Sequence, residues 1–423
     1  MTHIMKTIIK NIKEIISASK HNKNNPKKGA EMNKIQSLKD GWISISEGKI
    51  EDFGTMKEWN GVENWNETTI IDANQGYILP AWCDSHTHCV YAGSRESEFV
   101  DRIKGLSYED IAKNGGGILN SAILLSKTSE KELYLQSSKR VDQIIKYGTG
   151  GLEIKSGYGL NTKNEIKMLR VIKQLKENFP IPIKSTFLGA HAVPKGYTKS
   201  NYIKSIINEM IPEIHKQGLA DYIDVFCDKG FFTAKETEKI LTVAAKYDLK
   251  SKIHANELAF SGGIEVGVKM GSISVDHLEY TDESQINLLL NSNTMPTLLP
   301  GTAFFLGLDY PPARHMIDMG LPIALASDFN PGSFPSGNMA FILSLACIKM
   351  KMKPMEAISA ATINGAFAME MNQELGSIEQ GKRANLIITK EIPSLNYIPY
   401  SINENNISKV LINGQIYYNY DSE

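Results

Sequence analysis

The stretch YILPAWCDSHTH, residues 77–88, is a short apolar run that ends on two histidines separated by one residue. Short apolar runs of this kind are typical of buried strands. In an extended strand alternate side chains point to the same face, so His86 and His88 can both reach one metal ion. Taken alone, the pattern is a weak signal in a chain with nine histidines. Its meaning depends on what the rest of the chain places beside it.

Seven further apolar runs follow, most of them ending on a polar or ionisable residue and separated by segments of helix length. They span residues 150–155, 183–191, 222–228, 250–257, 272–279, 294–300 and 321–328. Amphipathic helices are expected between them, for example over residues 164–178 and 235–247. Strands that alternate with helices pair in parallel, so eight such units predict a closed (β/α)8 TIM barrel.

Both ends of the chain are rich in strand signals. Residues 42–50 alternate around a Glu-Gly turn and residues 409–417 around an Asn-Gly turn, and both segments predict hairpins. The isoleucines between positions 8 and 16 fit a helix by spacing and a strand by β-branching, which leaves that segment open. We expect a small β-sandwich domain built from residues 1–77 and 373–423, and a catalytic barrel over residues 78–372.

The composition is typical of a globular protein and gives no indication of a nucleic-acid or membrane partner. Of its 423 residues, 42% are hydrophobic, and 46 basic residues balance 47 acidic ones. This balance removes the electrostatic reason to expect nucleic acid or a membrane surface as partner. No stretch reaches the roughly 18 uninterrupted apolar residues of a membrane span, and lysines interrupt the N-terminus, so we expect a cytoplasmic protein. The four cysteines form no Cys-X-X-Cys pair and are expected to pack in the core.

The predicted barrel directs the search for chemistry, because barrel enzymes carry their active sites at the carboxyl ends of the strands. The residues at those ends are His86, His88, His191, His254, His277 and Asp328. If they were ordinary core residues, their shared position would be accidental. Three imidazoles and a carboxylate, from His86, His88, His254 and Asp328, suit Zn²⁺ or Fe²⁺ with water completing the sphere. Two roles remain open for His277: it could be a fourth imidazole ligand of the metal, or it could interact with the oxyanion.

Several long strings add a family resemblance. PAWCDSHTH (80–88), Asp328 and GSIEQGKRAN (376–385) are similar to the amidohydrolase superfamily. Other strings resemble the imidazolonepropionase family within it: YAGSRESEF (91–99), NGGGI (114–118), EIKSGYGL (153–160), TFLGAHAVP (186–194), DVFC (224–227), DHLEY (276–280), LLPG (298–301) and DFNPG (328–332). The resemblance runs from about residue 40 to 390.

The resemblance implies a step of histidine degradation, in which water opens the ring of 4-imidazolone-5-propanoate to give N-formimino-L-glutamate. It implies a homodimer with one zinc or iron ion (Fe²⁺ or Fe³⁺) per chain, held by His86, His88, His254 and Asp328. The residues around this small anionic lactam would be Arg95, Tyr108, Tyr158, His191, Glu257, Asn330, Gly332 and Ser333. The chain departs from the family at Ala81, where glycine is common, at Asn385, where aspartate is usual, and at Ser333, where threonine is frequent. None of these is a metal ligand.

The chemistry of the residues agrees with that implication. A bound metal ion lowers the pKa of its water to roughly 7 and polarises a carbonyl. Asp328 would take the proton of that water, and His277 would stabilise the oxyanion. Glu257 would hold or protonate the leaving ring nitrogen. The planar guanidinium of Arg95 could pair with the propanoate of the substrate. The alternative is that Arg95 is an ordinary solvated arginine on the surface.

Two other functions have to be weighed. Another mononuclear amidohydrolase, such as a nucleobase or cyclic amidine deaminase, would share the metal set. It would not need Arg95 and Tyr158 for an anionic tail. A metal-free barrel that serves as a scaffold should have lost ligands, and all four are present.

Overall fold

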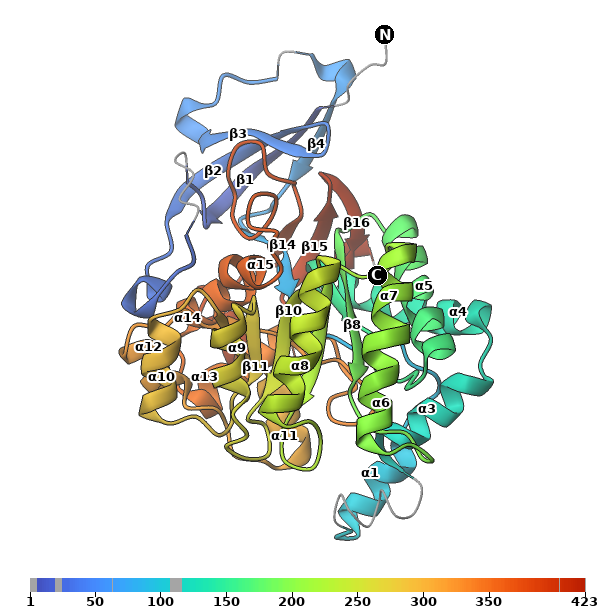
Figure 1. The fold of residues 1–423 in the computed structure, drawn as a ribbon. Coiled ribbons are helices and arrows are strands. Elements are labelled where there is room, and N and C mark those ends of the chain that lie inside the picture. Colours follow the sequence, from blue (N-terminus) through green and yellow to red (C-terminus); the bar gives the residue numbers. More distant parts are fainter. Residues whose placement is uncertain (1–5, 20–24, 63, 107–115, 403, 423) are drawn as a thin grey trace.

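The computed structural model describes residues 6–19, 25–62, 64–106, 116–402 and 404–422. Its centre is an eight-stranded parallel sheet with the order β13-β12-β11-β10-β9-β8-β7-β6 (Figure 1). The strands are β6 (Trp82–Asp84), β7 (Thr149–Lys155), β8 (Ile183–Ala190), β9 (Tyr222–Cys227), β10 (Lys250–Ala255), β11 (Ser274–His277), β12 (Met295–Leu298) and β13 (Ala324–Leu325). Each of the eight predicted runs contributes one strand, so the predicted barrel is confirmed.

The first of those runs belongs to two sheets rather than one. Its beginning, β5 (Tyr77–Pro80), pairs with β1 and β14 in a second sheet, and only β6 joins the barrel. The change occurs at Ala81, whose N–H donates to Asn385 O at 2.9 Å, while Trp82 N–H donates to Gly148 O at 2.8 Å. A continuous apolar run therefore links the two parts of the molecule. Its pattern alone does not reveal the switch, because both sheets bury it.

The barrel closes between its first and last strands. Asp328 N–H donates to His86 O at 2.9 Å, and His88 N–H donates to Phe329 O at 2.9 Å. Asp84 also links the first and last strands, because its carboxylate accepts from the N–H and the hydroxyl of Ser327 at 2.9 and 2.6 Å. The segments that carry His86, His88 and Asp328 are thus hydrogen-bonded neighbours, although some 240 positions separate them in the sequence.

Helices cover the outside of the barrel (Figure 1). They are α1 (Glu96–Ile103), α3 (Gly117–Lys127), α4 (Glu130–Lys146), α5 (Thr162–Asn178), α6 (Lys199–Ser205), α7 (Ile211–Gln217), α8 (Ala234–Ala244), α9 (Gly263–Met270), α10 (Glu283–Leu290), α11 (Pro300–Leu306), α12 (Ala313–Asp318), α13 (Met339–Met350), α14 (Pro354–Ser359), α15 (Gly365–Ala368) and α16 (Tyr397–Tyr400). The predicted helix 164–178 is α5, capped by the Asn161 side chain. The predicted helix 235–247 is α8 followed by a 3-10 turn, Ala245–Tyr247.

The two chain ends together form a second, mixed sheet. Its strands are β1 (Lys6–Ile16), β2 (Ser37–Ser46), β3 (Lys49–Thr55), β4 (Thr68–Asp72), β5, β14 (Leu386–Thr389), β15 (Ile407–Ile412) and β16 (Gln415–Asn419). Both predicted hairpins are present as β2–β3 and β15–β16. Ile9 and Ile43 share one hydrophobic cluster with Leu386 and Leu411, so both ends enclose a common core. The β-sandwich expected from the sequence takes the form of one continuous sheet.

The ambiguous segment near the N-terminus is strand β1. It pairs with β2 on one side and with β4 and β5 on the other. The pairing register with β2 shifts between Ile9 and Ile12, and Asn11 has a φ of 54°. This bulge changes which residues face the core, and it explains why the apolar spacing resembled a helix.

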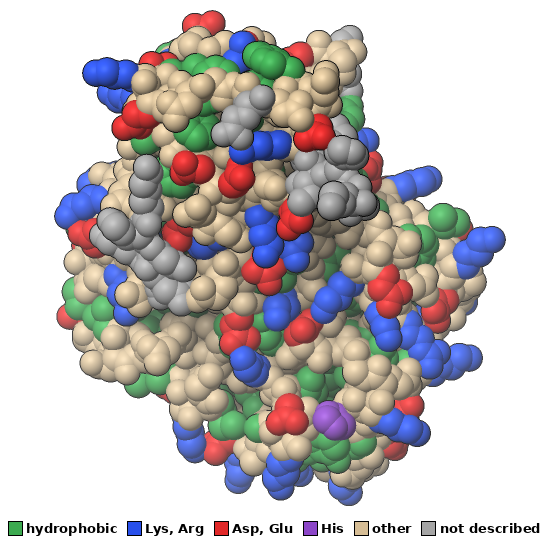
Figure 2. Space-filling model, turned by 90° about the horizontal axis from the view of Figure 1, so that it is seen from above, with side chains coloured by type: hydrophobic (Ala, Val, Ile, Leu, Met, Phe, Trp, Pro, Cys, Tyr) green, Lys and Arg blue, Asp and Glu red, His purple; other side chains and the backbone are tan. Residues whose placement is uncertain are grey.

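The outer surface carries mixed charge. On the face shown in Figure 2, Lys and Arg side chains are interspersed with Asp and Glu. Within the described ranges, no helix has both the length and the apolar character needed to cross a membrane. The cysteines are free, and three of them, Cys83, Cys89 and Cys227, are buried, as expected for packing residues.

Candidate active site

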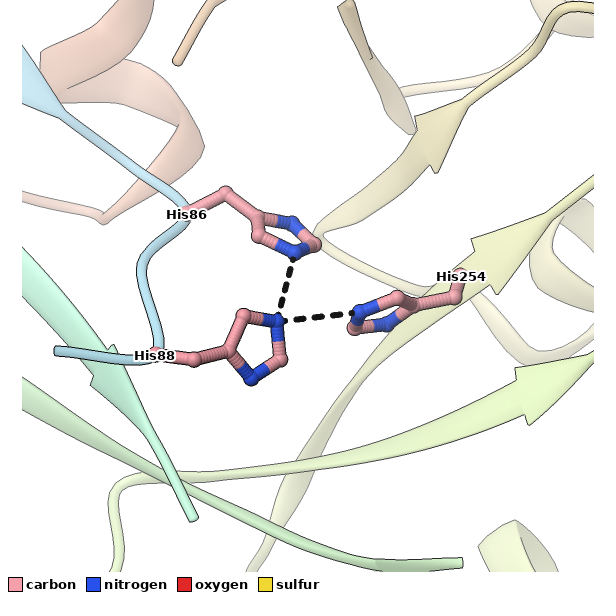
Figure 3. A group of neighbouring side chains, drawn as sticks. All are labelled: His86, His88 and His254. Atoms are coloured by element: carbon pink, nitrogen blue, oxygen red, sulfur yellow. Dashed lines mark hydrogen bonds between the residues drawn. The ribbon is translucent and has the colours of Figure 1, made fainter. Parts of the chain in front are cut away.

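Three histidine side chains meet at the carboxyl ends of the barrel strands (Figure 3). His86 and His88 follow β6, and His254 lies near the end of β10. The Nε2 atom of His88 lies 3.2 Å from Nε2 of His86 and 3.4 Å from Nε2 of His254. All three side chains are buried.

Asp328 lies beside two members of this group. Its Oδ1 atom lies 3.5 Å from His86 Nε2 and 3.4 Å from His88 Nε2. Donor atoms about 2.0–2.1 Å from a tetrahedral zinc ion are roughly 3.3–3.4 Å apart. The separations of His88 from His86, His254 and Asp328 are close to that figure, and the three histidines form a group that could hold a metal ion. Asp328 has a φ of 52°, and a non-glycine residue in this region stores about 1–3 kcal/mol of strain.

Two buried carboxylates fix how the imidazoles point. Asp276 Oδ2 lies 2.6 Å from His86 Nδ1, and Asp224 Oδ2 lies 2.9 Å from His254 Nδ1. A proton on Nδ1 in each contact leaves the Nε2 lone pair free for a metal. Burial lowers the pKa of His86 well below its ordinary value, which favours the neutral, metal-binding form. His88 is positioned differently, because its ring stacks on His191 with centroids 5.5 Å apart.

A second group of ionisable side chains surrounds His277. Its Nε2 lies 3.7 Å from Glu257 Oε2, and its Nδ1 lies 3.9 Å from Glu279 Oε2. Burial lowers the pKa of His277 to about 3, so its ring is neutral. Burial also raises the pKa of both glutamates well above the ordinary value. Among the described residues, the compact group of possible ligands contains His86, His88 and His254, and neither His277 nor Asp328.

Arg95 is buried against the loop that follows Asp328. Its Nε and one terminal nitrogen donate to Glu98 Oε2 at 2.8 and 2.6 Å. A Cβ on Gly332 would lie 2.0 Å from the other terminal nitrogen of Arg95, so any larger residue there would force the guanidinium to move. The alternative of a solvated surface arginine is wrong, because Arg95 is 8% exposed. Asn330 orders the same loop by accepting from the N–H groups of Gly332 and Ser333, each at 2.8 Å.

The remaining predicted substrate residues divide into two sets. Tyr158 and His191 lie together beside His88, with ring centroids 5.4 Å apart, and both are buried. Ser333 accepts from Asn330 Nδ2 at 2.5 Å and lies 3.5 Å from Asp328 Oδ2. Tyr108 lies outside the described residues. The structure thus gathers the other predicted residues around the histidines at the carboxyl ends of the barrel strands.

Comparisons with known proteins show which family the chain resembles. A family model described as the amidohydrolase family matches residues 77–417. The imidazolonepropionase of Christiangramia forsetii is 52% identical over 414 residues, covering 97% of this chain and 100% of the relative. The imidazolonepropionase of Flavobacterium johnsoniae is 53% identical with the same coverage.

The chain belongs to the amidohydrolase family and, within it, to the imidazolonepropionases. A more distant imidazolonepropionase, from Alkaliphilus oremlandii, is still 42% identical over 96% of this chain and 97% of the relative. The solved guanine deaminase of E. coli has a TM-score of 0.74 at 13% identity, covering 98% of this chain and 99% of that one. The 5-methylcytosine deaminase of Klebsiella pneumoniae has a TM-score of 0.72 at 14% identity, covering 96% and 98%. These two likenesses concern the fold alone.

Several residues of this imidazolonepropionase site were not singled out from the sequence. They are the carboxylates that orient the histidines, the buried lysines near them, and the side chains that support Asp328, His277 and Arg95: Asp224, Asp276, Glu153, Lys155, Lys252, Thr302, Glu279 and Glu98. A usable signal was present, because Lys252 and His254, like Glu153 and Lys155, are two apart on a strand and share a face.

Proposed function

We propose that this chain hydrolyses 4-imidazolone-5-propanoate to N-formimino-L-glutamate in histidine degradation. The observation that carries the proposal is the convergence of three buried histidines, with Asp328 beside two of them, in a chain whose imidazolonepropionase relatives align over nearly their whole length. The deaminase alternative rests on likeness of fold alone.

The proposed metal ligands are His86, His88, His254 and Asp328, with zinc or iron as the ion. The separations of their donor atoms fit such an ion, as does burial, which lowers the pKa of His86 and His88 and favours their neutral form. When bound, the ion supplies a water of lowered pKa and polarises the lactam carbonyl. Asp328 takes the proton from the attacking water. Its free oxygen is steadied by the Thr302 hydroxyl, which donates to Oδ2 at 2.5 Å.

His277 and Glu257 serve the later part of the reaction. As a neutral ring, His277 donates a hydrogen bond to the oxyanion that forms when water adds to the carbonyl. The ring C–N bond then breaks, and its nitrogen must gain a proton. Glu257 supplies that proton, because burial raises the pKa of its carboxyl well above the ordinary value and so favours the protonated form. Glu257 also lies beside His277, where the leaving nitrogen would be.

The substrate's propanoate is assigned to Arg95, with Tyr108, Tyr158, His191, Asn330, Gly332 and Ser333 completing the pocket. Glu98 accepts from Nε and one terminal nitrogen of the guanidinium, and we assign the substrate's carboxylate to the other terminal nitrogen, which packs against Gly332. A fork held in this way loses little freedom on binding a carboxylate. With this assignment, the site would bind an anionic lactam in preference to a neutral nucleobase.

The proposal also covers the organisation of the chain. We divide it into a catalytic barrel, residues 78–372, and a composite β-domain, residues 1–77 and 373–423, in a cytoplasmic homodimer. The 3-10 turn Gly29–Asn33 of the first segment contacts the barrel, since Met32 O accepts from Ser359 Oγ at 2.7 Å. Separate expression of residues 1–77 should therefore give no stable fold, and sedimentation equilibrium would measure the dimer.

The decisive experiment follows the loss of imidazolone absorbance with the purified chain, alongside elemental analysis for zinc and iron. We expect turnover, one metal ion per chain, and formiminoglutamate as product. Asp328→Ala is the matched control and should show neither turnover nor metal. Ammonia release from a neutral nucleobase, without turnover of the imidazolone, would contradict the proposal and favour the deaminase alternative.

A further inference from the structure

Five charged side chains from neighbouring strands are enclosed in the barrel interior. They are Glu153, Lys155, Asp224, Lys252 and Asp276, and each has 0% exposure. Removing an ion from water costs several kcal/mol even after the protein relaxes, so such a cluster persists only when its members are closely paired. The reaction proposed above uses none of these five residues directly, which leaves their role to be explained.

The two lysines of this cluster have different partners. Lys155 Nζ lies 2.7 Å from Glu153 Oε1, 2.8 Å from Asp224 Oδ2 and 3.6 Å from Asp276 Oδ2. Lys252 Nζ pairs with Glu153 Oε2 and donates to the carbonyls of Ser85 and Ala368 at 2.9 and 3.3 Å. Among the described residues, only Lys155 of the two forms ion pairs with Asp224 and Asp276.

Those two aspartates are the side chains that face the Nδ1 atoms of the candidate ligands. Asp276 Oδ2 contacts His86, and Asp224 Oδ2 contacts His254. The same Oδ2 atoms contact Lys155. One ammonium group therefore connects the supports of two imidazoles that belong to non-adjacent strands of the sheet, β6 and β10.

We propose that Lys155 is a positioning residue of the metal site, which aims His86 and His254 at a common point by holding Asp276 and Asp224 together. Two like-charged carboxylates in the same enclosed space repel each other, and the shared ammonium opposes that repulsion. Without it, the carboxylates separate and the two rings turn with them. The inference rests on the proposed function only in assigning His86 and His254 as metal ligands.

The cluster offers a matched pair of variants. Lys155→Met with Glu153→Gln removes one positive and one negative charge, and Lys252→Met with Glu153→Gln does the same. Both double variants keep the net charge of the cluster, and both replace an equally buried lysine by an apolar side chain of similar length. They differ in whether the ammonium that touches Asp224 and Asp276 remains.

The experiment measures metal binding rather than turnover. The full chain and both double variants are stripped of metal and titrated with Co²⁺ against a chelating dye, and the visible Co²⁺ spectrum is recorded. We expect Lys155→Met/Glu153→Gln to bind Co²⁺ about 10–100-fold more weakly, as for other residues that orient metal ligands, with an altered spectrum. Lys252→Met/Glu153→Gln should keep the affinity and spectrum of the unsubstituted chain.

Three results would overturn the inference. The two double variants could lose affinity equally, or neither could lose it. The Lys155 variant could also fail to fold as apoprotein, by circular dichroism, while the Lys252 variant folds, which would make Lys155 a residue of the fold. If the unsubstituted chain bound no Co²⁺, the metal site of the proposed function would fail, and this inference with it.

Discussion

The two sides of the site differ in how closely their ionisable side chains approach their partners. On the ligand side, His86, His254 and Asp328 each face a partner at 2.5–2.9 Å, namely Asp276, Asp224 and Thr302. Around His277, the contacts to Glu257 and Glu279 are 3.7 and 3.9 Å long. Within the described chain, both sides hold buried atoms without a hydrogen-bond partner: His88 Nδ1, His254 Nδ1 and Asp224 Oδ2 on the ligand side, and His277 Nδ1 and both oxygens of Glu279 on the other.

This difference suggests two roles. The side chains of the ligand side are held in place before the substrate binds, whereas those around His277 gain their hydrogen-bond partners from the substrate. A metal site needs its ligands fixed in advance, because each orienting contact raises affinity for the ion. Buried polar groups without partners are costly unless something binds them. The His277 side therefore has unused hydrogen-bonding capacity where a polar ring with a carbonyl and a nitrogen would fit. Each side can be disturbed separately.

The largest effect is expected on the ligand side. Asp328→Ala removes an oxygen that lies 3.4 Å from His88 Nε2, and the ion loses both a ligand and its charge. Because metal supplies several kcal/mol of transition-state stabilisation, kcat should fall by roughly 10³-fold or more. Elemental analysis should find less than stoichiometric metal. A variant with full metal content would remove Asp328 from the ligand set.

The His277 side should respond in kcat without loss of metal. Glu257→Gln keeps the shape and removes the proton donor, so kcat should fall about 10²–10⁴-fold at unchanged metal content. Glu279→Gln is the matched control, since it is also buried beside His277 with a raised pKa. Its side chain is 1% exposed against 10% for Glu257, so it reaches the pocket less. Equal losses in the two variants would contradict the role of Glu257.

The pH dependence of kcat tests whether Glu257 acts as the acid. Burial raises the pKa of Glu257, and the active form is the protonated one. Activity should therefore be present below that raised pKa and be lost as the pH rises through it. In Glu257→Gln this alkaline limb of the kcat profile should disappear. If the limb stayed where it is, another group would be the acid.

His277 tests whether the two sides are separate at all. Its ring centroid lies 5.2 Å from that of His254, close enough to raise the question of ligation. We expect His277→Asn to lower kcat about 10²–10³-fold, as for removal of an oxyanion donor, with metal retained. Loss of the ion in this variant would make His277 a ligand and would merge the two sides into one.

The sequence predicted the ligand side better than its supports. His86, His88, His254 and Asp328 were found because they lie at or near the ends of apolar runs, and parallel strands bring such ends together. Asp224 and Asp276 lie within runs, Lys155 ends a run but was not singled out, and all three interact across strands. Their partners depend on the pairing of β7, β9, β10 and β11, which no local pattern specifies.

The fold shows the same division between local and non-local information. Alternation and turn residues predicted the barrel strands and both hairpins. They did not predict that residues 77–80 join one sheet and residues 82–84 another, or that a bulge at Asn11 gives β1 a helix-like spacing. Both features are set by backbone hydrogen bonds to non-local segments, from Gln75 N–H to Asn11 O at the bulge and from Ala81 N–H to Asn385 O at the change of sheet.

The smallest effect is expected at Arg95, which contributes to neither metal binding nor proton transfer. Arg95→Ala should raise KM about 10–100-fold, the worth of a charged hydrogen bond of about 1.5–3 kcal/mol, with kcat and metal content little changed. Gly332→Ala tests the same contact from the other side, because its Cβ would fall 2.0 Å from the guanidinium and displace it. Both variants should raise KM for the anionic substrate. If both left KM unchanged, the propanoate would bind elsewhere, and the pocket would lose its reason to prefer an anionic lactam over a neutral base.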